Sequence, residues 1–171
     1  GLGGGLFMGM LRYSKTRWIS YPAMLYVEIF RNTPVLVQII WFFFALPVVT
    51  GIEVSPMMAA VLGITLNTIA FSAEVFRGGI QSIKSEQWDA GKAIGMSYAQ
   101  SMRRVILPQA LKRMLPPLTS RGIEVFKMST LASVVAYPET LQQAKLIASY
   151  EYNPIEAYTV VALMFFIVLL P

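Results

Sequence analysis

Long apolar segments dominate this sequence. Met57 to Ala73 contains no charged residue, and the segment VLVQIIWFFFALPVV, from Val35 to Val49, is almost wholly apolar. A helix needs about 20 such residues to cross roughly 30 Å of hydrocarbon. The chain is 56% hydrophobic and 13% charged, with a mean hydropathy of +0.58, which lies outside the range of an ordinary soluble domain. The sequence therefore predicts an all-α integral membrane protein, built as a helical bundle.

The sequence contains no cysteine and no histidine, two residue types that support much enzyme chemistry. This excludes disulfide scaffolds, thiolate nucleophiles and histidine proton transfer. We expect no catalytic residue, no metal site and no cofactor bound by this chain. The sequence starts at Gly1 and its last apolar run stops at Pro171, so we expect a fragment whose first and last helices are truncated.

The apolar segments divide the chain into spans and connections, which we treat as one transmembrane domain. The expected parts are the end of a first span at 1–11, a second span at 21–49, a third at 57–80, a polar loop at 85–108, a fourth span at 115–137, an external segment at 138–156 and the start of a fifth span at 157–171.

The positions of the lysines and arginines orient these spans. Basic residues are retained on the cytoplasmic side of short loops. When the spans alternate in direction, most of the 14 lysines and arginines fall on the side of the 85–108 loop, whereas Lys145 lies on the other side among four glutamates. The loop is therefore predicted to be cytoplasmic. This asymmetry also accounts for the net charge of +5 without nucleic-acid binding.

The cytoplasmic loop contains signals for two short helices. Ser85 is a candidate N-cap of the first, and Gly95 is placed to end it. Ser97 and Gln100 have the spacing of a capping box, which predicts the start of a second helix. Pro108 is expected to redirect that helix.

The first of these helices is rich in small residues around Trp88. Small side chains allow another surface to approach the backbone, and a tryptophan can anchor a contact. These features indicate a docking element. An amphipathic helix that lies on the lipid surface is an equal alternative from composition.

The spacing within this loop resembles that of a known family. Membrane subunits of ABC importers carry a cytoplasmic loop in which Glu-Ala-Ala is followed at fixed distances by Gly, Ile and Leu-Pro. This sequence has Asp89-Ala90-Gly91, Gly95, Val105 and Leu107-Pro108 at the same distances. Aspartate, glycine and valine replace glutamate, alanine and isoleucine, so the chemistry of each position is retained.

The likeness extends to the branch of that family that imports polar amino acids such as histidine, glutamate and glutamine. The segments EIFRNTPVLVQIIWF, EVFRGGIQSI and VILPQALKRMLPPLTS resemble parts of that branch. The resemblance implies a five-helix core in the bacterial inner membrane, a second membrane subunit that is a copy or a paralogue, two ATP-binding subunits that hold ATP and Mg²⁺, and an external solute-binding protein. It assigns coupling to the ATPase to Ser85, Glu86, Trp88, Asp89, Ala90, Gly91, Gly95, Leu107 and Pro108.

The assignment of ATP binding to another subunit agrees with the absence of a phosphate-binding motif from this sequence. The sequence has no G-x-x-x-x-G-K-[ST] phosphate loop, so another chain must bind ATP.

A second polar feature lies within the fourth span. Polar residues recur there at every third position from Arg121 to Ser133. Lys127 lies about 16 Å before Pro138 on a helix, near the middle of the hydrocarbon core. Glu124 is a candidate ion-pair partner. The open alternatives are a substrate pathway and a structural ion pair. The candidate pathway residues are Glu124, Lys127, Thr130, Ser133, Asn67 and Ser72, although hydrogen bonding between helices is the favoured interpretation of Asn67 and Ser72.

Two other classes compete with an importer subunit. An integral-membrane enzyme would use Glu124 and Lys127, but it would lack histidine, cysteine and paired acids. A secondary transporter would explain charges within the membrane, but it would leave the cytoplasmic loop unexplained.

Overall fold

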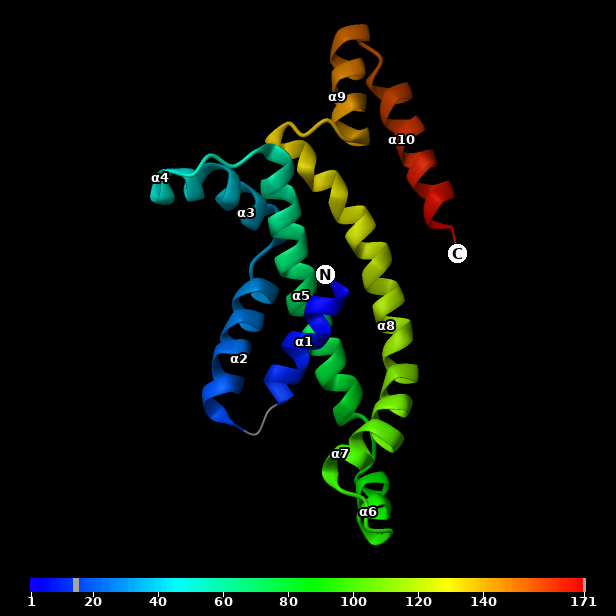
Figure 1. Ribbon diagram of the computed structural model, residues 1–171. Coiled ribbons are helices and arrows are strands. Elements are labelled where there is room, and N and C mark those ends of the chain that lie inside the picture. The colour runs from blue at the N-terminus through cyan, green and yellow to red at the C-terminus, as the bar shows by residue number, and fades with distance from the viewer. Residues whose placement is uncertain (14–15, 171) are drawn as a thin grey trace. The chain divides into compact units, whose positions relative to one another are not determined.

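The computed structural model describes residues 1–13 and 16–170. All regular elements in this part of the chain are helices (Figure 1). The residues form two compact units, one made of Gly1–Asn32 and Leu66–Gly122 and the other of Thr33–Thr65 and the chain from Ile123 onward. The elements are α1 (Leu2–Tyr13), α2 (Arg17–Asn32), α3 (Val35–Ile40), η1 (Trp41–Ala45), α4 (Leu46–Thr50), α5 (Pro56–Gln81), α6 (Ser85–Ala93), α7 (Tyr98–Ser101), η2 (Met102–Ile106), α8 (Leu107–Met128), η3 (Ser129–Val135), α9 (Thr140–Glu151) and α10 (Pro154–Leu169).

Close packing of α1 on α5 organises the first unit. Gly5 and Gly9, one turn apart on α1, are both buried. A Cβ atom on Gly5 would lie 2.3 Å from the Cβ atom of Ser72, and one on Gly9 would lie 2.9 Å from the carbonyl oxygen of Ala73. Small residues four positions apart let membrane helices approach at the backbone. Glycine is therefore required at this contact.

Polar contacts attach α2 to α5 in the same unit. The hydroxyl of Tyr26 donates to the carbonyl oxygen of Leu66 at 2.8 Å, and Asn67 Nδ2 donates to the carbonyl oxygen of Phe30 at 2.7 Å. Both carbonyl oxygens belong to residues in helices, so the side chains of one helix bind the backbone of the other. Such bonds hold helices together in a membrane, where the hydrophobic effect does not drive one helix onto another.

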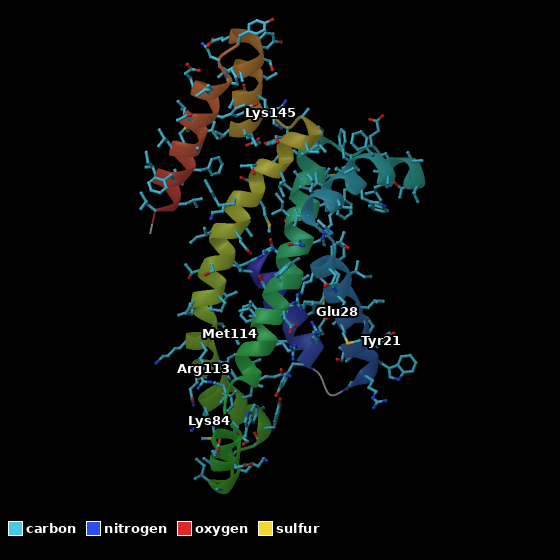
Figure 2. All side chains as sticks on the ribbon, turned by 180° about the vertical axis from the view of Figure 1, so that it is seen from behind. Tyr21, Glu28, Lys84, Arg113, Met114 and Lys145 are labelled. Carbon is cyan, nitrogen blue, oxygen red and sulfur yellow. The ribbon has the colours of Figure 1, made fainter. Side chains whose placement is uncertain are left out.

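Glu74 of α5 joins three arginines from three helices. It accepts hydrogen bonds from Arg12 of α1 and from Arg77 of α5, and Arg31 Nη1 of α2 lies 3.9 Å from its Oε2 atom. Arg12 also pairs with Glu28 of α2 at 3.1 Å. These ion pairs form a network that binds α1, α2 and α5; its Glu28 is labelled in Figure 2.

A hydrophobic cluster joins the end of α5 to the start of α8. Ile106 and Ala110 are fully buried, and Met114 is 1% exposed. The Met114 side chain occupies the space at Gly79, where a Cβ atom would lie 2.4 Å from it. We call this group the base cluster; it comprises Phe76, Ile80, Ile83, Ile106, Ala110 and Met114.

The second unit has a smaller core. Val35, Ile39 and Val135 are buried together, and Gly63 of α5 lies against Ile39, where a Cβ atom would be 2.8 Å from Ile39 Cγ1. Helices α9 and α10 pack side by side in this unit (Figure 1). Residues 138–156, which the sequence analysis expects as an external segment, thus contain the short helix α9.

Pro34 and Pro108 have different effects on the helices around them. Residues 21–49, expected as one helix, form α2, α3, η1 and α4, because Pro34 disfavours helical geometry at Thr33 and α2 ends at Asn32. Pro108 instead lies inside a continuous helix, so the prediction that it redirects the chain is wrong. The amide of Leu107 donates to the carbonyl oxygen of Met102 in a wide π-helical turn, which provides room for the proline ring.

One helix among the described residues, α5, is long and apolar enough by itself to cross a membrane; α2 with the α3–α4 segment would make a second if they form one broken span. The other apolar helix, α10, is shorter. The expected fourth span at 115–137 falls in α8 and η3, where Arg121, Glu124 and Lys127 lower the hydropathy.

Replacing Ile106 with alanine tests the base cluster. We expect Ile106→Ala to destabilise the fold by about 2–5 kcal/mol, because it leaves a cavity among fully buried side chains. The thermal unfolding midpoint of the purified protein in detergent measures the loss. Ile94→Ala is the matched control, because Ile94 is 73% exposed. Equal midpoints for the two variants would contradict the assigned role of the cluster.

Candidate functional site

The first helix of the 85–108 loop, α6, ends as its sequence predicts. Gly95 has a left-handed φ of 76°. The amide of Met96 donates to the carbonyl oxygen of Gly91 at 2.9 Å, and the amide of Gly95 donates to that of Lys92 at 2.9 Å. These two bonds form a Schellman motif, which favours glycine at the left-handed position. The prediction that Gly95 ends the helix is confirmed.

The start of α6 differs from the prediction. Lys84 occupies the N-cap position with an extended backbone and without a capping hydrogen bond from its side chain, so Ser85 is the first helical residue. The prediction of Ser85 as N-cap is therefore wrong. Glu86 in the first turn and Lys92 in the last turn still match the helix dipole.

The start of α7 agrees with its sequence signal. Ser97 Oγ accepts a hydrogen bond from the amide of Gln100, and the Gln100 side chain accepts one from the amide of Ser97 at 2.8 Å. The predicted capping box is confirmed. Together with Gly95 it fixes the reversal of the chain between α6 and α7.

Trp88 and Gly91 attach α6 to the rest of the first unit. The indole of Trp88 stacks on the phenol ring of Tyr98, with ring centroids 5.3 Å apart and planes 16° apart. Gly91 is buried on Ser101, and a Cβ atom on Gly91 would lie 2.6 Å from Ser101 Oγ. The close approach suggested by the small residues occurs within the chain, where Trp88 also packs on the base cluster.

Two polar contacts link α8 to α6 and to the connection before α6. Gln109 Nε2 donates to Gln87 Oε1 at 3.0 Å. Arg113 donates to the carbonyl oxygen of Ser82 and lies 3.2 Å from the Ser82 hydroxyl, in the connection between α5 and α6 (Figure 2). Ile83 of that connection is buried in the base cluster. Movement of α6 must therefore act on the ends of both α5 and α8.

The opposite side of α6 is open. Asp89 and Lys92 form an ion pair at 3.1 Å with side-chain exposures of 67% and 73%, so the pair adds little to stability. Of the other predicted coupling residues, Leu107 is half-buried and the remainder are exposed: Ser85, Glu86, Ala90, Gly95 and Pro108.

Asn67 and Ser72, two predicted pathway residues, lie in helix contacts of the first unit. Ser72 is fully buried beneath Gly5. Asn67 bridges α2 and α8, because it donates to Phe30 and accepts a hydrogen bond from Arg121 Nη2 at 2.6 Å. These positions agree with the helix-bonding alternative for both residues.

The burial of Arg121 was not foreseen from the sequence. Arg121 is 4% exposed, and its guanidinium carbon lies 4.3 Å from the centroid of the Phe71 ring, in addition to its bond to Asn67. Cation–π contacts strengthen when they are removed from water. Two features of the sequence could have indicated this contact: Arg121 begins the polar series of the expected fourth span, and Asn67 is an asparagine in the mostly apolar third span.

The other predicted pathway residues belong to the second unit. Lys127 and Thr130 line a cavity of about 520 Å³ whose remaining wall comes from apolar residues near the end of α10. Glu124 is exposed. Ser133 is buried, and Lys145 Nζ of α9 donates to its hydroxyl at 3.0 Å. The structure therefore groups Lys127 with Thr130 and places Ser133 in a helix contact.

Metal ligands do not gather in the described residues, which contain no group of three or more histidine, cysteine, aspartate or glutamate side chains able to hold an ion.

Comparison with known proteins identifies similar chains. The family model for binding-protein-dependent transport system inner membrane components matches residues 1–171. The chain is 39% identical over 161 residues to a probable amino-acid ABC transporter permease of Bacillus subtilis, covering 94% of this chain and 71% of that protein. It is 37% identical over 175 residues to a glutamine transport system permease of Escherichia coli, covering 99% and 80%.

Solved structures show the same likeness. The fold matches a chain in the crystal structure of an amino acid ABC transporter with histidines, with a TM-score of 0.92, 33% identity and coverage of 98% of this chain and 78% of that chain. A chain of the inward-facing MetNI methionine ABC transporter matches with a TM-score of 0.71 at 20% identity, covering 98% and 80%. The second match concerns the fold alone.

Removing the amide of Asn67 tests its contacts. We expect Asn67→Leu to destabilise the protein by about 1–3 kcal/mol, because it removes hydrogen-bond partners from Phe30 and Arg121 in a buried site. Thermal unfolding of the purified protein measures the change. Asn153→Leu is the control at an exposed position. An Asn67→Leu protein as stable as this control would refute the bridging role.

Proposed function

The chain belongs to the family of binding-protein-dependent transport system inner membrane components, and from that membership we propose that it is an importer subunit for polar amino acids that receives its driving force through α6. As an inner membrane component of such a system it is a permease and not itself an enzyme. ATP binds to a partner ATPase, and a binding protein presents the substrate. This membership decides against a membrane enzyme and a secondary transporter.

One observation carries the coupling role: α6 is firmly attached on one side and open on the other. Trp88, Gly91 and Gln87 attach it to α7 and α8, whereas Asp89 and Glu86 are exposed. A helix that transmits motion needs both properties, because it must bind a moving partner and pass the displacement on as a rigid body. In this proposal the ATPase receives the exposed side of α6, and nucleotide-driven closure moves α5 and α8.

The substrate class follows from the relatives. The names of the similar proteins describe amino-acid permeases, one of them for glutamine, and the matching crystal structure is of an amino acid transporter with histidines. We propose a polar amino acid for this chain too. The transmembrane part would be the five-helix core of the importer type, which pairs with a second membrane subunit.

Lys127 is the proposed contact for the substrate carboxylate. Lys127 lines a cavity together with Thr130, and Lys127 is exposed. A lone cation in the middle of a membrane costs at least about 2.5 kcal/mol, which favours a position facing water or an anionic group over one facing lipid. All amino acids carry a carboxylate, so this contact would not select among them.

The external binding protein would dock near α9. This helix lies in the segment that its scarcity of lysine and arginine predicts to be external, and Lys145 and Ser133 attach it to η3. The binding protein would thus release its substrate beside the second unit, where Lys127 lies.

Reversing the charge of Asp89 tests the coupling role. We expect Asp89→Arg to lower ATP-dependent amino acid uptake in reconstituted vesicles by about tenfold or more, because a like charge at an interface costs several kcal/mol. The fold should be retained, since Asp89 is exposed. Glu53→Arg is the control at an exposed acid far along the chain from α6. Uptake by Asp89→Arg equal to that of the control would exclude this role for α6.

Neutralising Lys127 tests the substrate contact separately. We expect Lys127→Gln to raise the substrate concentration for half-maximal uptake by about tenfold, because a hydrogen bond to a charged group contributes about 1.5–3 kcal/mol. Basal ATP hydrolysis by the assembly should not change. Lys112→Gln is a matched control at an exposed lysine. An unchanged half-maximal concentration would leave Lys127 without a part in substrate binding.

A further inference from the structure

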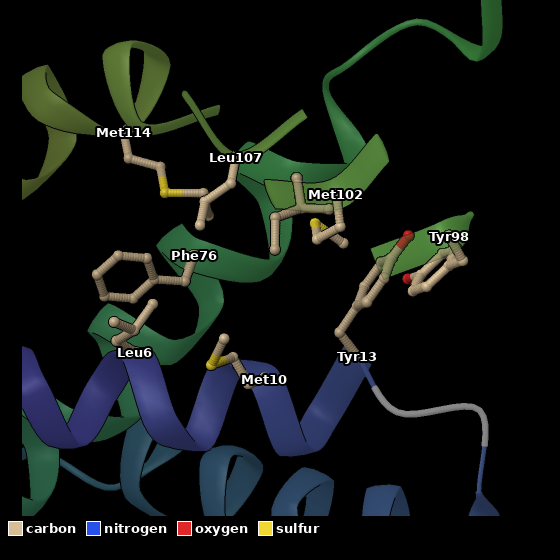
Figure 3. A pocket seen from close by; sticks show the side chains of 9 residues that line it. Leu6, Met10, Tyr13, Phe76, Tyr98, Met102, Leu107 and Met114 are labelled. Carbon is tan, nitrogen blue, oxygen red and sulfur yellow. The ribbon is translucent and has the colours of Figure 1, made fainter. Parts of the chain in front are cut away.

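An apolar cavity of about 450 Å³ lies in the first unit and has no part in the function proposed above. Leu6, Met10 and Tyr13 of α1 form one wall (Figure 3). Phe76 lies opposite, and Tyr98 and Met102 close one end. The cavity thus separates the end of α1 from the elements that hold α6.

The lining determines what kind of molecule fits. The lining side chains are aliphatic, thioether or aromatic, and the two phenol hydroxyls are their only hydrogen-bonding side-chain groups. The volume falls within the range of about 300–1,000 Å³ that is usual for ligand cavities. An amino acid or a nucleotide would lose its hydrogen bonds to water here without replacement. The lining therefore suits a hydrocarbon chain.

The cavity has an open side and a polar end. Met10 is 55% exposed although it lines the cavity, so the space is open beside α1. The Tyr13 and Tyr98 hydroxyls lie together at the end away from Leu6 (Figure 3). Burial raises the pKa of Tyr98, as do the neighbouring Tyr13 and the hydrogen bond with it, so the phenol of Tyr98 stays neutral at physiological pH. Tyrosines with an apolar ring and a polar tip are typical of the membrane interface.

Positive charge follows the cavity wall along the chain. Arg103 and Arg104 come directly after Met102, a lining residue, in η2, and both side chains are exposed. In the described part of the chain neither forms an ion pair with a carboxylate. Arginine binds phosphate with two parallel hydrogen bonds. An apolar cavity with two phenols at one end and two arginines next to a lining residue offers partners for both the acyl chain and the phosphate of a phospholipid.

We propose that this cavity binds an acyl chain of an anionic phospholipid from the cytoplasmic leaflet, with its phosphate at Arg103 and Arg104. The leaflet follows from the cytoplasmic position of the 85–108 loop, and the apolar depth comes from residues at the ends of the expected spans. Tyr98 carries the stacked Trp88 of α6. A bound acyl chain would therefore fill the space behind the coupling helix and support its attachment to α1.

Photocrosslinking in vesicles tests the proposal with the complete transporter assembly. The probe is a phosphatidylglycerol with a diazirine on its acyl chain, and mass spectrometry locates the modified residues. We expect labelling of Met102 and Tyr98 on the cavity wall. Met10→Trp should reduce labelling of Met102 by about an order of magnitude, because the indole occupies the space. Phe7→Trp, on the same helix but outside the cavity, should leave it unchanged.

The charge of the lipid headgroup allows a second test of the proposal. Replacing Arg103 and Arg104 together with glutamine should reduce labelling of Met102 by the phosphatidylglycerol probe several-fold, and the matching phosphatidylcholine probe should lose its labelling far less. Labelling of Met102 that persists in Met10→Trp would overturn the proposal. Crosslinking of Met102 to a second protein chain, with no lipid adduct there, would also overturn it and would assign the cavity to a subunit interface.

Discussion

The packing of Ile106 and Ile83 in the base cluster is the contact on which the rest of the first unit depends. Ile83 belongs to the connection before α6, and Ile106 precedes α8. Because both are buried with Phe76, the chain enters and leaves the polar loop through a single apolar core. The loop therefore cannot move as a flexible linker. Trp88, Gly91 and Gln87 then fix α6 to this core, so that a displacement of α6 reaches α5 and α8 together.

The charges of the first unit reinforce this arrangement. Glu74 binds arginines from α1, α2 and α5, and Asn67 joins Arg121 of α8 to the backbone of α2. Charges and amides are costly in a hydrocarbon medium unless they are paired, so such contacts favour one arrangement of the helices over alternatives. The helices of the first unit that would receive force from α6 in the proposed mechanism thus form a connected body. The polar residues that we propose for substrate contact, Lys127 and Thr130, lie in the other unit.

The sequence predicted the features that depend on neighbouring residues. Gly95 ends α6 and Ser97 starts α7, because these signals act through hydrogen bonds within a few residues. Features that depend on distant contacts were not accessible. The inward packing of Trp88 needs Tyr98, and the burial of Ser72 needs Gly5 on another helix. The role of Pro108 depends on a π-helical turn for which the sequence has no clear signal.

Distances between spin labels test the central claim, that α6 and the start of α8 move as one body. The chain has no cysteine, so Ala93→Cys at the exposed end of α6 and Lys112→Cys introduce unique labelling sites on this subunit. Pulsed EPR would compare the complete transporter without nucleotide and with bound ATP. The account predicts an unchanged distance between the two labels within one subunit, while the distance from the Ala93→Cys label to a label at the same position of the second membrane subunit changes. A change in the distance within one subunit would contradict it.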